Sequence, residues 1–497
     1  MGDRSARFGL RWERTVPLAP ALLAGAHLSG LLLFLNPHLP LSVRRLAFDT
    51  LLYGALFALP SFALFWLAAR RRGARPARLL PWSLVVVTAA GALGDWVHAS
   101  FYAFYLPPGI NVQLIKTALW LTLGSVLLFY TALLHTLHKR AYGSRSLLLL
   151  ALVALGTVYA MFDRRTSFRP SERGPRRVLA LEAEEAPRAV VVELPGATLD
   201  ALLPLAEQGR LPGFRQIVER GAVAPLAGFA PVRPLALRAS WATAKLPFRH
   251  GLTGATVWEP GVLGLEQPLR LLPLGVGFAA WGLPAGDARP ISAAERTALP
   301  VWEILARAGR RTLVVGFDPA LGGAPGPHHP VAAGARAPSD AERLLAEANQ
   351  PELLAWLRGD LDRLEALRAE LVSDPPHVAF VSLSGLEQAS LATFGGFVRA
   401  EFEASDSREA RRAADALVAY LAGLDGALAG LWEAIPPPRL LALSSAYGTA
   451  APGGLSRLVG GQGTAGTMAG PPDGVLLLRG EGVRPGVPIP AASGLDV

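Results

Sequence analysis

Five long apolar stretches, separated by short polar loops, dominate the first third of the chain. Each is close to the roughly 20 residues that a helix needs to cross a bilayer. No cleaved signal peptide is predicted, because further spans follow the first one closely and no small-residue cleavage site is obvious. The pattern therefore predicts a membrane domain of about five transmembrane helices over residues 1–165. The stretches are Val16–Leu35, Phe48–Ala69, Leu80–Leu106, Ile115–His135 and Leu147–Phe162.

A different pattern follows the polar, arginine-rich segment Thr166–Arg188, which is typical of a linker. Short apolar runs there alternate with amphipathic stretches. This alternation predicts an α/β domain over residues 189–497, with a mostly parallel sheet and helices on both of its faces. The expected strands are Ala189–Leu194, Arg311–Gly316, Val378–Leu383, Leu440–Leu443 and Gly474–Leu478. The expected helices are Leu199–Glu207, Gly213–Arg220, Pro300–Ala308, Ala341–Val372 and Arg408–Ala434.

Charge adds a direction to the membrane domain. The net charge of +9 divides into 17 Lys and Arg against 5 Asp and Glu up to residue 165, and 31 against 34 beyond it. The basic excess thus lies beside the apolar spans, and no nucleic-acid partner is predicted. Arginines gather before the first span, between the second and third, and between the fourth and fifth. The positive-inside rule then predicts a cytoplasmic N-terminus and an extracytoplasmic α/β domain.

Composition narrows the setting further. The chain has no cysteine, which excludes disulfides, thiolate metal sites and a cysteine nucleophile. Its many Arg, Ala, Gly and Pro residues are typical of a GC-rich bacterial genome, so we expect a multi-pass protein of the bacterial inner (cytoplasmic) membrane. The lipid bilayer is its first expected partner.

One polar pair interrupts the apolar pattern. Asp95 and His98 are three residues apart in the third span, on one face of a helix. An ionisable pair inside a membrane is a functional hypothesis by default, here the handling of a proton or substrate. The alternatives are that the span ends near Trp96, which places the pair at the interface, or that the two side chains satisfy each other.

Several motifs of the α/β domain resemble one family. They are VVVELPGATLD from Val190, GRLPGF from Gly209, ATAKLPFRHG from Ala242, VWEIL from Val301 and PDGVLL from Pro472. In this order they resemble the alkaline-phosphatase superfamily, in its type I phosphodiesterase/nucleotide pyrophosphatase branch, which is sulfatase-like. The resemblance implies the alkaline-phosphatase-like fold and phosphoryl or sulfuryl transfer at two divalent metals. It also implies one more helix after residues 491–497, so a missing final helix is expected.

The positions that carry the family's chemistry are mostly altered. Where the resemblance implies a metal-binding Asp after the first strand, this chain has Pro195. The nucleophile's place holds Arg233, and the Asp and His after the strand at Val378 are replaced by Glu387 and Leu391. The family's Ser-Asp-His-Gly turn is replaced by residues 444–448, which lack both the Asp and the His. Pro, Leu and Ala offer no donor atoms to a cation, so the resemblance implies a degenerate active site with no metal expected.

Three residues remain candidates for binding a ligand. Glu193 lies two residues before Pro195, and Glu387 keeps a carboxylate at a ligand position. A guanidinium at Arg233 can hold a phosphate or an anionic lipid headgroup without cleaving it; the alternative is an ordinary surface arginine. His250 is expected to be a hydrogen-bonded helix end, and Asp425 a solvated or capping carboxylate.

The leading hypothesis is a membrane-anchored, phosphodiesterase-like protein that is catalytically inactive and acts as an envelope binding or regulatory protein. An anionic lipid headgroup or an envelope protein would be its partner, and no cofactor is expected. The alternative is an active metal-dependent phosphodiesterase or phosphotransferase on lipid-linked or nucleotide substrates, with zinc or manganese. A third hypothesis assigns the function to the membrane domain through Asp95 and His98.

Overall fold

The chain forms two compact units. The first comprises Met1–Glu172 and Thr256–Arg289, and the second comprises Arg173–Ala255 and Pro290–Val497. Residues 256–289 therefore group with the N-terminal helices, although they lie far along the sequence. The computed structural model describes residues 17–40, 42–72, 76–138, scattered positions from 145 to 163, 188–259, 268–274, 287–322, 337–403, 405, 407–450, 472–486, 489 and 492–496.

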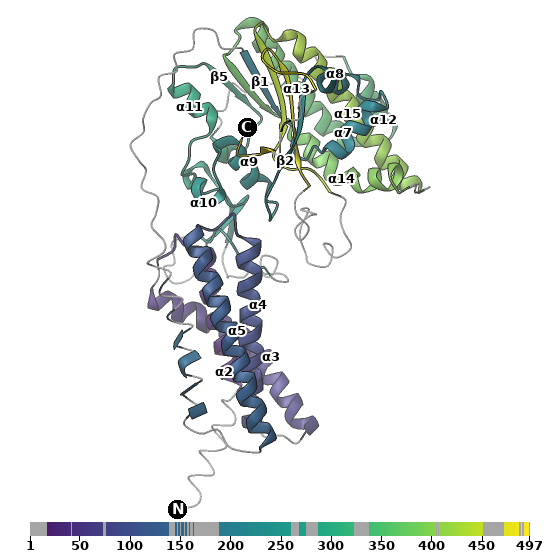
Figure 1. The fold of residues 1–497 in the computed structure, drawn as a ribbon. Helices are drawn as coiled ribbons and strands as arrows, with labels where there is room; N and C mark the ends of the chain where they lie inside the picture. The colour runs from purple at the N-terminus through teal and green to yellow at the C-terminus, as the bar shows by residue number, and fades with distance from the viewer. Residues whose placement is uncertain are drawn as a thin grey trace, which may run out of the picture. The chain divides into compact units, whose positions relative to one another are not determined.

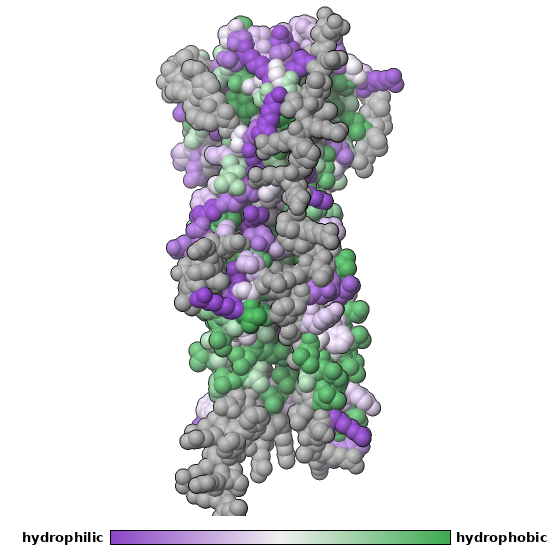
Figure 2. All heavy atoms as spheres, turned by 90° about the vertical axis from the view of Figure 1, so that its left-hand side faces the viewer, coloured by the Kyte–Doolittle hydropathy of each residue, from purple (hydrophilic) through white to green (hydrophobic). Residues whose placement is uncertain are grey.

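Long apolar helices build the first unit. They are α2 (Leu18–Leu35), α3 (Val43–Arg72), α4 (Pro76–Phe101) and α5 (Pro108–Leu137). Each is long and apolar enough to cross a membrane, and Figure 2 shows apolar side chains gathered over this part of the chain. These helices confirm four of the predicted spans, so the chain is a membrane protein. The fifth predicted span, Leu147–Phe162, lies mostly outside the described residues.

A close approach of small residues joins α2 to α3. A Cβ added to Gly25 would lie 2.4 Å from the carbonyl oxygen of Thr50 and 2.6 Å from the backbone nitrogen of Gly54. Only glycine allows the two backbones to come this near, as is common where apolar helices pack in membranes. The sequence therefore fixes the contact of these two helices through residues that carry no side chain.

The third and fourth predicted spans, Leu80–Leu106 and Ile115–His135, have different bounds in the structure. The third apolar helix ends at Phe101, before the predicted end at Leu106, and α5 already begins at Pro108. Pro108 is the first residue of this helix, where a proline's fixed φ and missing N–H are tolerated. Pro107 and Pro108 therefore mark the start of a helix.

The part of the first unit that comes from later in the sequence contains a small two-stranded sheet. Strand β3 (Thr256–Glu259) pairs with β4 (Asp287–Pro290), and Trp258 also forms a backbone bridge with Leu269. Leu269 and Trp258 pack in one apolar cluster with residues of the membrane helices. The buried members on the helix side are Leu32, Leu33, Leu39 and Tyr53. Residues 268–274 thus pack against the C-terminal end of α2 and the chain that follows it.

A seven-stranded sheet forms the centre of the second unit (Figure 1). Its order is β5-β6-β1-β7-β8-β2-β9. Only β8 runs antiparallel to its neighbours within this order. The predicted mostly parallel sheet is therefore confirmed. The strands are β1 (Arg188–Glu193), β2 (Ala222–Ala227), β5 (Thr312–Val315), β6 (Val378–Ser382), β7 (Arg439–Ser445), β8 (Gly474–Gly480) and β9 (Ala492–Ser493).

Helices cover both faces of the sheet, as predicted (Figure 1). One face packs its buried Val and Leu side chains against a layer of six helices to form the main core. That layer comprises α7 (Leu199–Glu207), α8 (Pro212–Arg220), α12 (Asp340–Glu347), α13 (Pro351–Ser373), α14 (Ser384–Glu401) and α15 (Arg408–Ala434). Elements on or near the other face include α9 (Pro234–Thr243), α10 (Pro247–His250), α11 (Val301–Arg307) and the short 3-10 helices η1 (Ala293–Glu295) and η2 (Pro319–Leu321).

Two details of the helical layer refine the predictions. The long helical region expected over Ala341–Val372 consists of two helices, α12 and α13, and Asn349 between them has a φ of 54°. The following Pro351 then begins α13 at its first turn.

Helix α15 meets the length and hydropathy of a membrane span, yet its apolar face lies in the core of the second unit. Asp425 on this helix accepts hydrogen bonds from the N–H groups of Gly213 and Phe214 and so caps α8.

Candidate functional site

Three parallel strands end side by side at one edge of the sheet. In the register of the sheet, Glu193 of β1 pairs with Ser382 of β6 on one side and with Ser444 of β7 on the other. All three side chains are buried. Ligand sites of open α/β sheets form at this edge, outside the carboxyl ends of the strands.

An arginine from α9 fills the space above these strand ends. The guanidinium of Arg238 donates to both carboxylate oxygens of Glu193, at 2.7 and 2.8 Å, and to the hydroxyl of Ser382 at 2.8 Å. Arg238 is 7% exposed and Glu193 is 1% exposed. The two-point geometry is the strongest form of an arginine–carboxylate pair.

Arg238 stays charged despite its burial. Desolvation alone lowers the pKa of Arg238, but the charge and hydrogen bonds of Glu193 outweigh it, and the net pKa lies above the ordinary value. Tyr447 and Glu387 raise it further. Arg238 is therefore a permanent cation at the carboxyl edge of the sheet.

Glu387 and Tyr447 complete the cluster. Glu387 lies in the first turn of α14, and the Tyr447 hydroxyl donates to its Oε1 at 2.7 Å. Burial raises the pKa of Glu387, the hydrogen bond from Tyr447 and the charge of Arg238 lower it, and the charge of Glu193 raises it again. The net shift is upward. Two of the candidate residues, Glu193 and Glu387, thus act electrostatically on the same arginine.

Arg233, the third candidate, lies at the N-terminal end of α9. It is half-buried, precedes Pro234, and its Nη1 donates to the carbonyl oxygen of Thr253 at 3.2 Å. It reaches the loop after α10, where a Cβ on Gly254 would come within 2.9 Å of Nη1. The structure therefore places Arg233 on the same helix as Arg238, five residues earlier.

The sequence reasoning missed Arg238. Arg233 is predicted because it replaces the expected nucleophile of the motif, whereas Arg238 matches no motif position. A signal was nevertheless present, since Arg238 is the one charged residue among Leu, Ala, Ser, Trp and Thr in residues 234–243. A lone arginine in an otherwise apolar or small helix is rarely buried unless it has a partner.

The residues at this edge do not fit the two metal ions that the family resemblance implies. Both oxygens of Glu193 are engaged by Arg238. Pro195 follows β1, Ala446 follows β7, and Leu391 is 45% exposed on α14. Within the described part of the chain, no group of three or more His, Cys, Asp or Glu residues is arranged to hold a metal ion. We therefore derive no reaction step through a metal.

His250 has a structural role, in agreement with the expectation. Its Nδ1 accepts the N–H of Leu252 at 3.1 Å, which leaves Nε2 to donate to the Ser240 hydroxyl at 3.0 Å. The residue is fully buried at the end of α10, and burial lowers its pKa to about 3. The neutral ring ties α10 to α9.

No family profile and no curated protein matches this chain. Among solved structures, phosphonoacetate hydrolase from Sinorhizobium meliloti 1021 in complex with phosphonoacetate is 16% identical, with a TM-score of 0.31, over 53% of this chain and 56% of that one. A mutant of alkaline phosphatase PafA is 16% identical with a TM-score of 0.35 (56% and 66%). Inactive murine ectonucleotide pyrophosphatase/phosphodiesterase 5 in complex with AMP is 16% identical with a TM-score of 0.29 (53% and 57%). The chain thus spans 56% to 66% of these proteins' lengths.

The buried ion pair predicts a large loss of stability when one partner is removed. Glu193→Ala leaves the Arg238 guanidinium buried without its counter-charge, so we expect the free energy of unfolding of the full chain to fall by about 3–5 kcal/mol. Denaturant unfolding in detergent, followed by tryptophan fluorescence, measures it. Glu219→Ala, which removes the exposed ion pair with Arg215, is the control and should lose less than about 1 kcal/mol. Equal losses in the two variants would contradict the assignment.

His250 predicts a pH dependence. Because burial lowers its pKa to about 3, the unfolded chain takes up a proton at this residue at a higher pH than the folded chain does. The stability that the neutral ring contributes is complete above the ordinary pKa of about 6.5 and is lost as the pH falls toward about 3. His250→Asn keeps an acceptor for the Leu252 N–H, so its stability should fall less steeply over this range. Parallel curves of unfolding midpoint against pH would show that the expectation is wrong.

Proposed function

We propose that this chain is a membrane-anchored, phosphodiesterase-like protein of the alkaline-phosphatase superfamily that binds a ligand and does not hydrolyse it with metals. The observation that carries the proposal is the guanidinium of Arg238, held by Glu193 and Ser382 at the carboxyl edge of the sheet. In the family that the sequence resembles, this edge holds the catalytic metal ions. Here a side chain of the protein supplies the positive charge.

A guanidinium is a poor replacement for a metal in catalysis. A metal ion offers an open coordination position and lowers the pKa of a bound water or nucleophile. The Arg238 donors Nε and Nη2 are directed at Glu193 and Ser382, and arginine cannot give up its proton at accessible pH. The cluster therefore holds charge in place, which suits binding and fold stability better than turnover.

Arg233 is the proposed contact for an anion. It stands where the resemblance expects the nucleophile, and it is half-buried at the start of α9. Its charge and planar donor group match a phosphate or an anionic lipid headgroup. We propose that such a group is bound there and left intact, which gives an envelope binding or regulatory protein.

The setting that we propose is the bacterial inner membrane. Arginine-rich segments before the first span and between the second and third support a cytoplasmic N-terminus by the positive-inside rule. With the fifth span expected over residues 147–162, the α/β unit would lie on the extracytoplasmic side. Anionic lipid headgroups are abundant ligands in that location.

The inactive state predicts no metal-dependent turnover. The purified full-length protein in lipid nanodiscs should hydrolyse bis(p-nitrophenyl) phosphate no faster than empty nanodiscs, with zinc or manganese added, and should retain neither ion after desalting. The contrary outcome is bound metal with turnover that disappears in Glu387→Ala. That result would establish an active phosphodiesterase or phosphotransferase with a rebuilt site.

Anion binding predicts a specific effect of Arg233. The loss of a charge-assisted hydrogen bond corresponds to about 1.5–3 kcal/mol, which raises the dissociation constant roughly tenfold to hundredfold. We expect Arg233→Ala to weaken the binding of dihexanoyl phosphatidic acid by this factor in native mass spectrometry. Arg307→Ala, an exposed arginine on α11, is the matched control and should bind as the unaltered chain does. Equal affinity in both variants would remove Arg233 from the site.

A further inference from the structure

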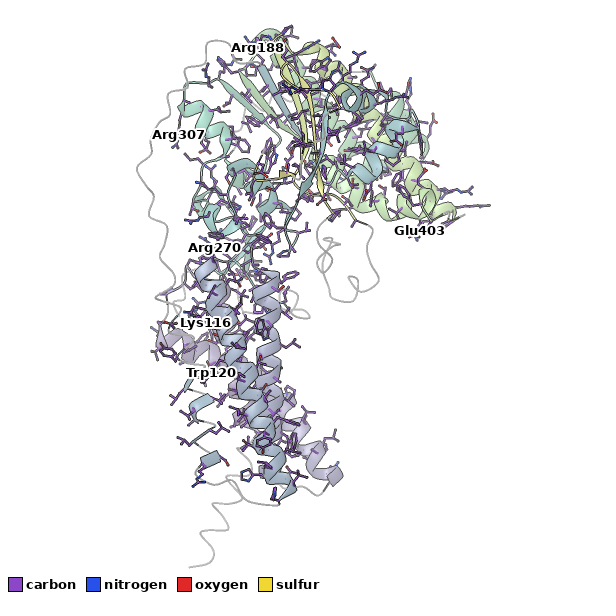
Figure 3. All side chains as sticks on the ribbon, viewed as in Figure 1. Lys116, Trp120, Arg188, Arg270, Arg307 and Glu403 are labelled. Atoms are coloured by element: carbon purple, nitrogen blue, oxygen red, sulfur yellow. The ribbon has the colours of Figure 1, made fainter. Side chains whose placement is uncertain are left out.

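The C-terminal ends of α2 and α4 hold a short segment from a distant part of the sequence. We call this segment, residues 268–274, the strap. It belongs to the same compact unit as α2 and α4, and Figure 3 labels Arg270 within it. Its backbone is held by side chains, so the contact depends on particular residues of the helices.

Asn36, directly after α2, is the main residue that holds the strap. Its Oδ1 accepts the N–H groups of Arg270 at 2.7 Å and Leu271 at 3.1 Å, and its Nδ2 donates to the carbonyl oxygens of Leu271 at 2.8 Å and Leu32 at 3.0 Å. The residue is fully buried. An amide side chain can make four hydrogen bonds, and all four are made here.

His98 of α4 and Tyr102, directly after this helix, contribute two further contacts to the strap. Tyr102 donates its hydroxyl to the carbonyl oxygen of Leu272 at 3.1 Å. His98 accepts the N–H of Leu274 at its Nε2, at 2.6 Å, while its Nδ1 lies 2.6 Å from the carbonyl oxygen of Gly94. The carbonyl can only accept, so Nδ1 carries the proton and Nε2 is free to accept. The bond from Leu274 therefore requires the neutral imidazole, whereas Nδ1 can donate to Gly94 in either protonation state.

We propose that His98 makes this contact a proton-sensitive latch. A second proton would go to Nε2 and turn the acceptor into a donor facing the Leu274 N–H. The hydrogen bond is then lost and the end of the strap is released. Histidine is the side chain that changes charge between about pH 5 and 8, and the released state binds one more proton than the latched state. Acid therefore favours release.

The charged and titratable groups around His98 bear on this balance. Its own helix carries Asp95, Tyr102 directly follows this helix, α5 carries Lys116, and the strap carries Arg270. The residues in and after α2 include His27 and His38, and His38 lies 2.8 Å from the carbonyl oxygen of Pro268 through its Nε2. Both ring nitrogens of His98 are nevertheless engaged by Gly94 and Leu274, so its protonation state acts directly on the strap.

Because the chain has no cysteine, one introduced thiol reports on the strap alone. Leu271 is 1% exposed, so Leu271→Cys in nanodiscs should react slowly with a dithiodipyridine reagent while the strap is latched. Between about pH 8 and about pH 5, we expect its rate, relative to free thiol, to rise by about tenfold, the equivalent of one hydrogen bond. Leu272→Cys replaces it should Leu271→Cys not fold.

The control is the same thiol combined with His98→Gln. Glutamine offers an oxygen acceptor to the Leu274 N–H but does not titrate, so its rate should not change with pH. A separate Ala379→Cys protein, buried in β6, should stay unreactive and excludes general unfolding. Asn36→Ala should raise the Leu271→Cys rate at every pH. A flat profile with His98 present, or the same rise in His98→Gln, would overturn the latch.

Discussion

The ion pair between Arg238 and Glu193 is the constraint on which the second unit depends. It joins α9 to the ends of β1 and β6, and a buried charge left without its partner is strongly destabilising. Once Glu193 ends β1 at the carboxyl edge, α9 must place its arginine over that edge, and Trp241 on the same helix then reaches the hydroxyl of Ser444 on β7. One electrostatic requirement thus fixes a helix against three strands. The ion pair also occupies both carboxylate oxygens of Glu193, which a metal ion would otherwise need as ligands.

The first unit meets a similar requirement with neutral groups. Asn36 and His98 are buried polar side chains among apolar helices, where an unpaired polar group is costly. The strap provides their partners. In exchange, side chains satisfy several of its N–H and C=O groups, and Leu269 pairs with the backbone of Trp258 on β3. Both units therefore use buried polar residues to determine position, while apolar packing supplies most of the stability.

Much of the fold could be predicted from the sequence, because hydrophobic periodicity records burial directly. For two of the predicted helices, Leu199–Glu207 and Arg408–Ala434, the structure has the same first and last residues as the prediction. The lone charge of Arg238 in residues 234–243 is visible in the sequence, but its role could not be predicted, because its partner lies at a strand end 45 residues earlier. The placement of residues 268–274 with the membrane helices could not be predicted either. The helices hold this segment by its backbone groups, which leave no pattern in its own sequence. Local patterns show which residues are buried, and they do not show which distant residues meet.

The polar pair of the third span now separates into two residues with different surroundings. His98 contacts the backbone of Leu274, so its place in an apolar helix follows from holding the strap. The alternative that Asp95 and His98 satisfy each other is wrong, because the ring nitrogens of His98 are taken by Gly94 and Leu274. Asp95 is 7% exposed one turn earlier on α4. The two residues therefore have separate roles in the structure: the position of His98 follows from the backbone that it holds, whereas, among the residues that the structure describes, no hydrogen bond joins Asp95 to the strap.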